Sequence, residues 1–388
     1  MRGAGVGRSE LPSLVRRVRR RPVLAPGSAA RALTELSRLT WGDPAGMWTL
    51  LDRHGDAPSA LDAARAMGGA SPPAGPGGTT EAAPAVAPRV LTYWDARYPA
   101  GLWRLPDPPP LLFCAGDTSL LERPALAVVG TRRCSEHGRR AARAIALAAG
   151  VSGVVVVSGH AQGIDAAAHE GALATGTIAV LGCGLDVAYP RTLAPLRAGI
   201  RERGLVLSEF PAGTPPLPRH FPRRNRIIAA LASALVVVEA PHRSGAQNTV
   251  THALDMGLDV GAVPGPIDRA NCAGSNRLLR EGAAAICEPA HALELVDAWR
   301  ATPAEAPGPA NDAGTRQPPG AAQPAGAPLA ADAIRNALAE APATIDELAE
   351  RGVLDAAGAS ATLLELELAG MVRRGPGGRF ALGSREGG

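Results

Sequence analysis

Residues 154–165 read VVVVSGHAQGID, and this stretch indicates how the chain folds. Four consecutive valines without polar alternation predict a strand that is buried on both faces, as in a parallel sheet. The small residues after them predict a tight turn, and the Ala-rich segment 163–175 has the length and composition of a helix. A buried strand, a turn and a helix together form the repeating unit of α/β proteins.

The same unit recurs over much of the chain. Apolar runs of strand length occur at 125–130, 154–158, 177–182, 205–208, 234–239 and 260–265, and segments of helix length occur at 135–149, 163–175, 191–203, 224–232 and 244–257. Strands that alternate with helices predict an α/β fold with an extended, doubly wound, Rossmann-like parallel sheet. Ligands of such sheets bind at the carboxyl ends of the strands, so we expect functional residues there.

Composition predicts further domains and linkers around this core. The chain has 388 residues, of which 46 are glycine and 36 are proline, so we expect two or three domains joined by linkers. We predict a disordered basic arm at 1–28, a small helical domain at 29–67, a linker at 68–88, the Rossmann-like core at 89–300, a linker at 301–328 and a winged-helix domain at 329–384. The winged helix is inferred from three helical patterns followed by MVRRGPGGRFAL at 371–382, which predicts a hairpin turning at Gly377 and Gly378.

The net charge of +4 is unevenly distributed. Residues 1–28 hold seven arginines and one glutamate, whereas residues 301–388 hold seven arginines and eleven acidic residues. The chain therefore has a basic N-terminal arm and an acidic C-terminal part. We expect the arm to assist anion binding only through long-range attraction, because we find no apolar pattern in it.

Several functional classes are disfavoured by what the sequence lacks. It has no run of ~18 uncharged apolar residues and no apolar segment of a secretory signal, so we expect a cytoplasmic protein without a membrane partner. The five cysteines never have C-x-x-C spacing, which favours reduced thiols over a zinc site or disulfides. A P-loop, a G-x-G-x-x-G after the first core strand, H-E-x-x-H and G-x-S-x-G are also missing. We therefore expect no cofactor, no metal and no catalytic residue.

Three strand-to-helix junctions are candidate anion sites. Their residues are Gly130, Thr131 and Arg132 after the first core strand, Ser158 and Gly159 after the second, and Ser244 and Gly245 before the helix that follows the fifth. Free backbone N–H groups and the positive end of the helix dipole favour phosphate at such turns. For any single junction an ordinary tight turn is the simpler interpretation, but three at one sheet edge favour a phosphate-binding edge.

The densest basic cluster is RHFPRRNR at 219–226, just before a predicted helix. Guanidinium groups bind phosphates and an aromatic ring stacks on an unpaired base, so the cluster predicts a single-stranded nucleic-acid site. The alternative is a charged helix start in which Phe221 packs into the core. Asp165 and His169 are four residues apart and allow an acid–base pair or a pair of ligands, but we favour a capping Asp165 and a packed His169.

Seven motifs occur in order between about residues 90 and 298. They are VVGTRRCSEHG (128–138), VVVSGHAQGIDAAAHEGAL (155–173), TIAVLGCGLDVAYP (177–190), SEFPAGTPP (208–216), FPRRNRIIAAL (221–231), VVVEAPHRSGAQNT (236–249) and AVPGP (262–266). In this order they resemble the DNA-processing protein A family, DprA, also called Smf. The resemblance implies a homodimeric protein that binds single-stranded DNA, protects incoming DNA and loads the recombinase RecA onto it in natural transformation and homologous recombination.

The resemblance also implies a set of DNA-binding residues. Carried over motif by motif, they are Gly130, Thr131, Arg132, Ser158, Gly159, Phe221, Arg224, Asn225, Arg226, Ser244, Gly245 and Thr249. This chain departs from the family pattern in one loop. Gln162 stands where the family often has arginine and His160 replaces a small apolar residue, so one positive charge is missing there.

Two other functions remain open from the sequence. A nucleotide phosphoribohydrolase of the lysine-decarboxylase-like group has a similar sheet, but its P-G-G-x-G-T-x-x-E motif is missing and the region reads EAPHRSG at 239–245. A transcription factor would read bases with the winged helix, but segment 356–369 lacks Arg, Asn and Gln and carries Glu365 and Glu367. We therefore expect the winged-helix domain to bind protein rather than duplex DNA.

Overall fold

The computed structural model describes residues 11–20, 23, 25–40, 42–67 and 88–301, and parts of the C-terminal region. Those parts are residues 334, 336–339, 341, 343, 347–348, 372–374 and 380–382. The chain divides into two compact units, Met1–Ala304 and Glu305–Gly388. The predicted linkers lie almost wholly outside the described residues.

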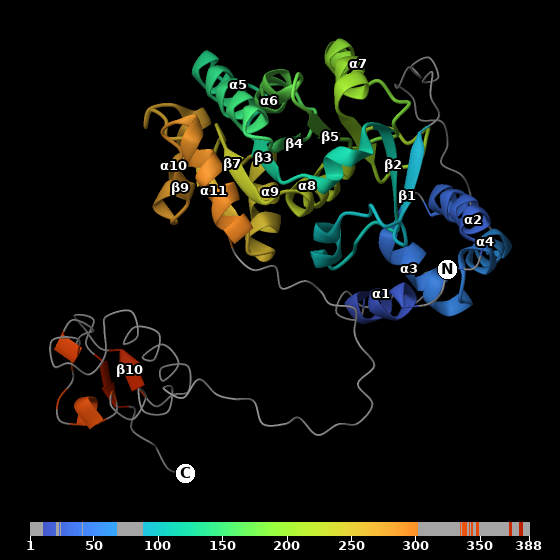
Figure 1. Cartoon of the computed structure of the whole chain (residues 1–388), viewed down its shortest axis with the longest axis horizontal. Coiled ribbons are helices and arrows are strands. Elements are labelled where there is room, and N and C mark those ends of the chain that lie inside the picture. The colour runs from blue at the N-terminus through green and yellow to red at the C-terminus, as the bar shows by residue number, and fades with distance from the viewer. Residues whose placement is uncertain are drawn as a thin grey trace. The chain divides into compact units, whose positions relative to one another are not determined.

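A nine-stranded sheet forms the centre of the first unit (Figure 1). Its strands lie in the order β1 (Arg89–Thr92), β2 (Leu111–Gly116), β6 (Leu205–Ser208), β5 (Thr177–Val180), β4 (Val155–Ser158), β3 (Ala125–Val129), β7 (Ala234–Val237), β8 (Asp259–Ala262) and β9 (Ala284–Ala285). Strands β3 to β9 pair in parallel, whereas β2 is antiparallel to both of its neighbours, β1 and β6. The Rossmann-like prediction is confirmed, and the antiparallel pair β1–β2 is an addition that we did not predict.

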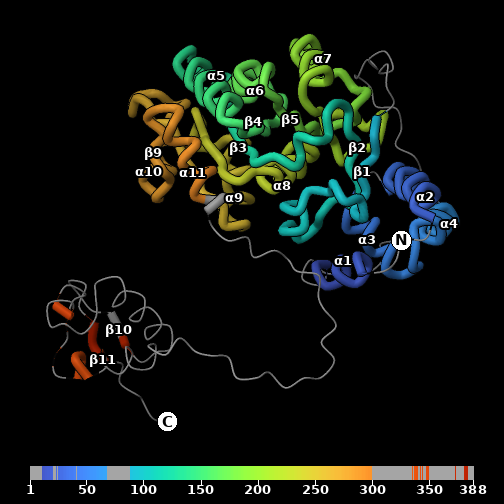
Figure 2. The backbone as a smooth tube through the Cα atoms, viewed as in Figure 1, coloured from blue at the N-terminus to red at the C-terminus, as the bar shows by residue number. Residues whose placement is uncertain are grey.

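Helices cover both faces of this sheet, as the tube view in Figure 2 shows. They are α5 (Glu136–Val151), α6 (Ile164–Ala172), α7 (Ala194–Arg203), α8 (His220–Leu231), α9 (Gly245–Asp255), α10 (Ala273–Arg280) and α11 (Pro289–Ala301). Leu126 and Val128 of β3 pack on the side of α5, α6 and α11. Ala125, Ala127 and Val129 pack on the side of α8, α9 and α10. Both faces of the strand are therefore buried, as its unbroken apolar sequence predicts.

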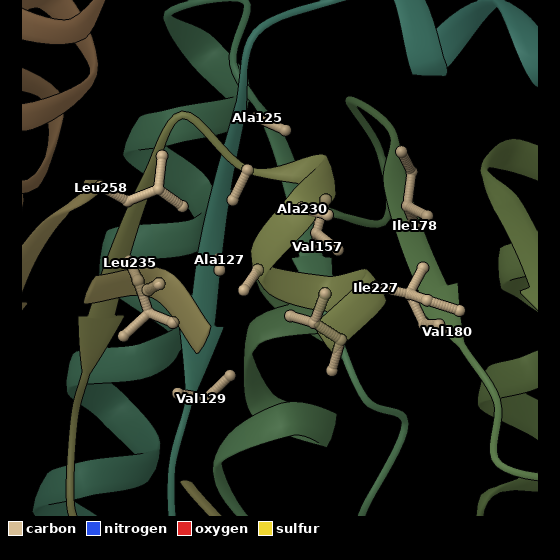
Figure 3. Packing of buried hydrophobic residues seen from close by; sticks show 14 of the residues in the cluster. Ala125, Ala127, Val129, Val157, Ile178, Val180, Ile227, Ala230, Leu235 and Leu258 are labelled. Carbon is tan, nitrogen blue, oxygen red and sulfur yellow. The ribbon is translucent and has the colours of Figure 1, made fainter. Parts of the chain in front are cut away.

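Helix α8 lies across the sheet with its apolar side towards the strands (Figure 3). Ile227 and Ala230 point at Val157, Ile178 and neighbouring strand residues, and all are buried. This packing fixes the rotation of α8. It therefore also fixes where the basic residues of its first turns are placed.

Four N-terminal helices belong to the same unit. They are α1 (Leu11–Arg19), α2 (Pro26–Leu39), α3 (Pro44–His54) and α4 (Ala57–Ala66). Asp43 and Asp56 cap α3 and α4 by accepting hydrogen bonds from backbone N–H groups. The buried side chains of these helices share one hydrophobic cluster with Leu111 and Phe113 of β2. The helices are where the sequence predicts them over 29–67, but they do not form a separate domain with a core of their own.

The prediction of a disordered arm at 1–28 is wrong for α1. Leu11, Leu14, Val15 and Val18 are spaced by three and four residues, and all four are buried. This apolar stripe stabilises an amphipathic helix although most of the remaining positions are arginine. Residues 1–10 lie outside the described residues.

The second unit is described only in part. Strands β10 (Val372–Arg374) and β11 (Phe380–Leu382) pair antiparallel, and Ala343 bridges to Phe380. Val372 and Phe380 share a small buried cluster with Ile334 and Leu338. The predicted hairpin is confirmed. Its turn at Gly377 and Gly378 and the helix expected at 356–369 lie outside the described residues.

Candidate nucleic-acid interface

The loops that follow β3, β4 and β7 meet at the carboxyl edge of the sheet. The N–H of Thr131 donates to the carbonyl oxygen of Glu239 at 2.7 Å, and the N–H of Ile164 donates to the carbonyl oxygen of Thr131 at 3.2 Å. The strand order reverses at β3, with β4 on one side and β7 on the other. Crevices at such a switch point are the usual ligand sites of α/β sheets.

Two glycines allow this close approach of backbones. A Cβ atom on Gly130 would lie 2.7 Å from the carbonyl oxygen of Glu239. Gly163 has φ +82°, and a Cβ there would lie 2.4 Å from the carbonyl oxygen of Thr131. Any larger residue at either position would push the junction loops apart.

An open pocket lies at this edge and combines two arginines with two aromatic rings. Its lining includes Arg132, Tyr189 and Phe221, with the loop 159–162 along one side. The Arg132 guanidinium lies 5.3 Å from the centre of the Phe221 ring. The rings of Tyr189 and Phe221 are 5.5 Å apart and tilted by 38°. Arg132 is exposed and Phe221 half-buried, so both remain accessible to a ligand.

This combination suits an unpaired nucleotide. A planar guanidinium binds a phosphate through two parallel hydrogen bonds, and an accessible ring stacks on any base. The alternative in which Phe221 packs fully into the core is not what the structure shows, since the ring lines the pocket. Phe221 and Arg132, which lie far apart in the sequence, are brought together in this pocket.

Arg224 forms the inner wall of the same pocket. Only 4% of the residue is exposed, and its Nη1 donates to the carbonyl oxygens of Gly159 and Val180. Burial lowers the pKa of its guanidinium to about 10, while the Asp165 carboxylate acts in the opposite direction. Arg224 therefore stays charged at neutral pH, and it holds the 159–162 loop against the end of β5.

Arg226 and Asn225 have internal partners. Arg226 is 4% exposed, and its Nη2 lies 2.5 Å from Oε2 of Glu209. Its Nε is 3.4 Å from Oδ2 of Asp107. The Nδ2 of Asn225 donates to the carbonyl oxygen of Gly245 at 3.2 Å. Sequence proximity suggested that Arg224 and Arg226 both reach phosphates, but the structure places Arg226 in a buried ion pair.

The remaining expected site residues divide into buried and accessible groups. Ser158 donates from Oγ to the carbonyl oxygen of Val128 at 2.7 Å, and it is fully buried together with Gly159 and Thr249. Gly245 is exposed at the start of α9, next to the half-buried Ser244. Ser158 and Thr249 thus support the edge from inside. Ser244 and Gly245 lie on its surface but do not line the pocket.

Tyr189 and His160 are pocket residues that we did not predict. Tyr189 is 37% exposed and is the second-to-last residue of the motif TIAVLGCGLDVAYP, so an aromatic residue after the carboxyl end of β5 was the available signal. His160 has φ +54°, which is rare outside glycine, and it is buried at the pocket wall. The positive φ of His160 is set by the loop 159–162, and the sequence did not predict it.

His169 is a packed residue, as we favoured. Its Nδ1 lies 2.8 Å from Oγ1 of Thr177, and burial lowers its pKa well below the ordinary value. Asp165 accepts a hydrogen bond from the N–H of Ala161 at 3.3 Å, while Gly163 is the N-cap of α6. Asp165 therefore stabilises the loop before the helix rather than capping it.

Glu239, the residue that aligns with the phosphoribohydrolase region, also has structural partners. It is 3% exposed and accepts hydrogen bonds from the N–H and the Oγ of Ser135 at the start of α5. A buried carboxylate held at a helix N-terminus is stabilised by the helix dipole. This arrangement gives no support to a catalytic role for Glu239.

Two further findings concern the described residues. They contain no helix long and apolar enough to span a membrane. Within the same residues, no group of three His, Cys, Asp or Glu side chains is placed to hold a metal ion.

Matches to family models identify the class of protein as a DNA recombination mediator. Residues 89–297 match the family model described as DNA recombination-mediator protein A, and residues 317–378 match the DprA winged helix domain. The first match covers more than half of the 388 residues. The chain belongs to the DprA/Smf family.

Known relatives agree with this assignment. Protein Smf of Synechocystis sp. (strain ATCC 27184 / PCC 6803 / Kazusa) is 36% identical over 320 residues, which cover 76% of this chain and 80% of that protein. Protein Smf of Escherichia coli (strain K12) is 37% identical over 288 residues, which cover 74% and 75%. The X-ray structure of DNA processing protein A (DprA) from Streptococcus pneumoniae is similar at a TM-score of 0.51 with 41% identity, covering 53% of this chain and 73% of that chain.

Proposed function

We propose that this protein binds single-stranded DNA at the pocket formed by Arg132, Tyr189 and Phe221. The observation that carries the proposal is the exposed Arg132 guanidinium 5.3 Å from the Phe221 ring, at the carboxyl edge of the sheet. Membership in a family of recombination mediators supports the same substrate class. Unpaired DNA is favoured because bases in a duplex are stacked and cannot place a face on a ring.

Each pocket residue has a distinct task in this binding. Arg132 pairs with a phosphate, and Phe221 with Tyr189 offers a platform for a base. Arg224 keeps the pocket open by holding the 159–162 loop, and its buried positive charge adds to the attraction for the backbone. Ser244 and Gly245 present backbone groups at the start of α9. Gly130 and Thr131 support the edge from inside, since the N–H and the carbonyl oxygen of Thr131 are bonded to neighbouring loops.

The wider role follows the family. We propose that the protein acts in the cytoplasm as a homodimer without enzymatic activity, protects incoming DNA and loads RecA onto it in natural transformation and recombination. These steps rest on the resemblance and on membership in the recombination-mediator family. The motifs that carry the resemblance identify no residue that would contact RecA.

The proposal is tested by equilibrium binding of single- and double-stranded oligonucleotides over a range of salt concentrations. We expect the single strand to bind more tightly, with Arg132→Ala lowering the salt slope by ~0.7 for the lost phosphate contact. Arg203→Ala, at an exposed position at the end of α7, serves as the control for loss of one charge. Equal affinity for both substrates, together with an unchanged slope in Arg132→Ala, contradicts the proposal. RecA filament formation on the same oligonucleotides tests the loading step separately.

A further inference from the structure

Helix α1 presents a row of arginines on its outer side. Its residues Arg16, Arg17 and Arg19, with Arg20 directly after it, are all exposed, while its apolar stripe is buried. At 100° per residue these four positions fall within about half of the helix circumference. The buried stripe fixes the rotation of the helix, so the positive charges are held on one surface.

Two of these arginines have partners in the protein. Arg17 forms an ion pair with Asp52 of α3, with 2.8 Å between Nη2 and Oδ2. The Arg19 guanidinium lies 4.1 Å from the centre of the Trp103 ring, in the 3-10 helix η1 (Ala100–Arg104). The ion pair with Asp52 and the cation–π contact with Trp103 therefore hold α1 against α3 and η1.

Three further arginines lie in α1, directly after it and in η1, the two elements joined by the contact between Arg19 and Trp103. Arg16 and Arg20 of the α1 region and Arg104 of η1 are exposed, and none of them pairs with an acidic side chain among the described residues. We define Arg16, Arg20 and Arg104 as the second basic surface. Its cations are held on ordered elements rather than on a flexible tail.

The second basic surface is connected to α8, the helix that carries Phe221. Trp103 packs on Tyr98 with 4.9 Å between the ring centres. Gly101 of η1 lies so close to α8 that a Cβ atom on it would overlap the carbonyl oxygen of Ala230, so η1 packs directly against α8. Ala230 follows Phe221 by nine residues, or about 13.5 Å along the helix axis. Ordered contacts therefore run from the pocket to α1.

The chemistry of this surface favours nucleic acid over a membrane or an apolar protein partner. Membrane-binding amphipathic helices keep an apolar face available, but the apolar stripe of α1 is buried in the protein. Among the described residues, the large exposed apolar side chains are Met67, Leu147, Val151, Tyr189, Leu254, Ile267 and Leu382, and none belongs to α1 or η1. A surface of fixed cations without apolar anchors suits a phosphate backbone.

We propose that Arg16, Arg20 and Arg104 bind the phosphate backbone of a single DNA strand that extends beyond the Arg132 and Phe221 pocket. This inference rests on the proposed function of the pocket, which it extends by a second contact region. The strand would place a base in the pocket and phosphates several nucleotides further along on α1. Short strands that fill only the pocket would not reach this surface.

The test compares strands of two lengths with the double variant Arg16→Ala/Arg20→Ala in the full chain. For a strand of about 30 nucleotides we expect the salt slope to fall by ~1.4, from two lost contacts at ~0.7 each. That slope makes the loss of affinity at ~0.05 M salt about sevenfold larger than at ~0.2 M. For a strand of about 4 nucleotides we expect affinity equal to that of the unmodified protein. Alanine favours helix, so α1 should stay folded, which circular dichroism verifies.

A matched control removes two charges elsewhere. Arg31→Ala/Arg203→Ala changes exposed residues of α2 and α7, so it alters the net charge equally without touching the second basic surface. If the two double variants bind the long strand alike, the inference is overturned. If Phe221→Leu weakens binding of both strands in that case, the pocket proposal stands alone. If Phe221→Leu has no effect but Arg16→Ala/Arg20→Ala does, the pocket proposal fails and the second basic surface remains.

Discussion

Replacing Arg226 with alanine should destabilise the fold and leave the electrostatics of DNA binding unchanged. Arg226 is 4% exposed and lies 2.5 Å from Glu209, whose side chain is 1% exposed. Removing one partner of a buried ion pair costs about 3–5 kcal/mol, because the other charge stays buried. Glu209 would keep Arg223 at 3.1 Å, so we expect the lower end, about 3 kcal/mol. Glu209→Gln leaves both arginines without this carboxylate, and its cost should lie nearer about 5 kcal/mol.

The assay combines urea unfolding with salt-dependent DNA binding on the same preparations. Arg226→Ala should lower the unfolding midpoint, and under folded conditions its salt slope should equal that of the unmodified protein. Arg132→Ala is the converse control. Replacing an exposed residue changes the free energy of unfolding by roughly 0.5 kcal/mol or less, whereas loss of its phosphate contact lowers the salt slope by ~0.7. An Arg226→Ala protein with an unchanged midpoint and a slope lower by ~0.7 would refute the assignment of Arg226 to the interior.

Three further predictions concern the pocket, the acidic domain and pH. Phe221→Ala should weaken single-strand binding by about 1–3 kcal/mol, or roughly 5- to 150-fold, with little change in salt slope, and Phe221→Leu tests whether the ring rather than apolar volume is required. Ending the chain after Thr302 removes a part with net negative charge, so single-strand affinity measured by anisotropy should stay within about threefold. Burial lowers the pKa of His220 from 6.5 to about 4, so between these values the unfolded chain binds a proton that the folded protein does not. The free energy of unfolding should therefore fall as the pH drops from 6.5 towards 4, and this dependence should be shallower in His220→Gln.

The sheet could be predicted because its strands are uniformly apolar. The runs at 125–130 and 154–158 have no polar alternation, and both become strands with two buried faces. β1 and β2 were not predicted, because the sequence between them contains several prolines. Antiparallel strands also need no helix between them, so the alternation of strands and helices that indicated the other strands is absent here. Helix α1 was not predicted, because its arginines suggested a disordered arm. The signal for the helix was the spacing of Leu11, Leu14, Val15 and Val18.

The site was predicted in outline and not in detail. Arg132 and Phe221 meet because parallel strands bring their junction loops to one edge. The burial of Arg226 could not be predicted, because its partners Glu209 and Asp107 are distant in the sequence. Arginine in a basic cluster is also usually exposed. Neighbouring residues on a helix point in different directions, so the cluster 219–226 divides between the pocket and the interior.

Photocrosslinking tests most directly whether single-stranded DNA occupies the pocket. An oligonucleotide carrying halogenated uracil forms a covalent bond with a nearby aromatic side chain on irradiation, and mass spectrometry of the digested complex identifies the residue. We predict crosslinks on Phe221 or Tyr189, which disappear in competition with unlabelled single strand and persist with duplex. Crosslinks confined to the C-terminal unit, or to peptides that contain neither residue, would contradict the assignment of the pocket.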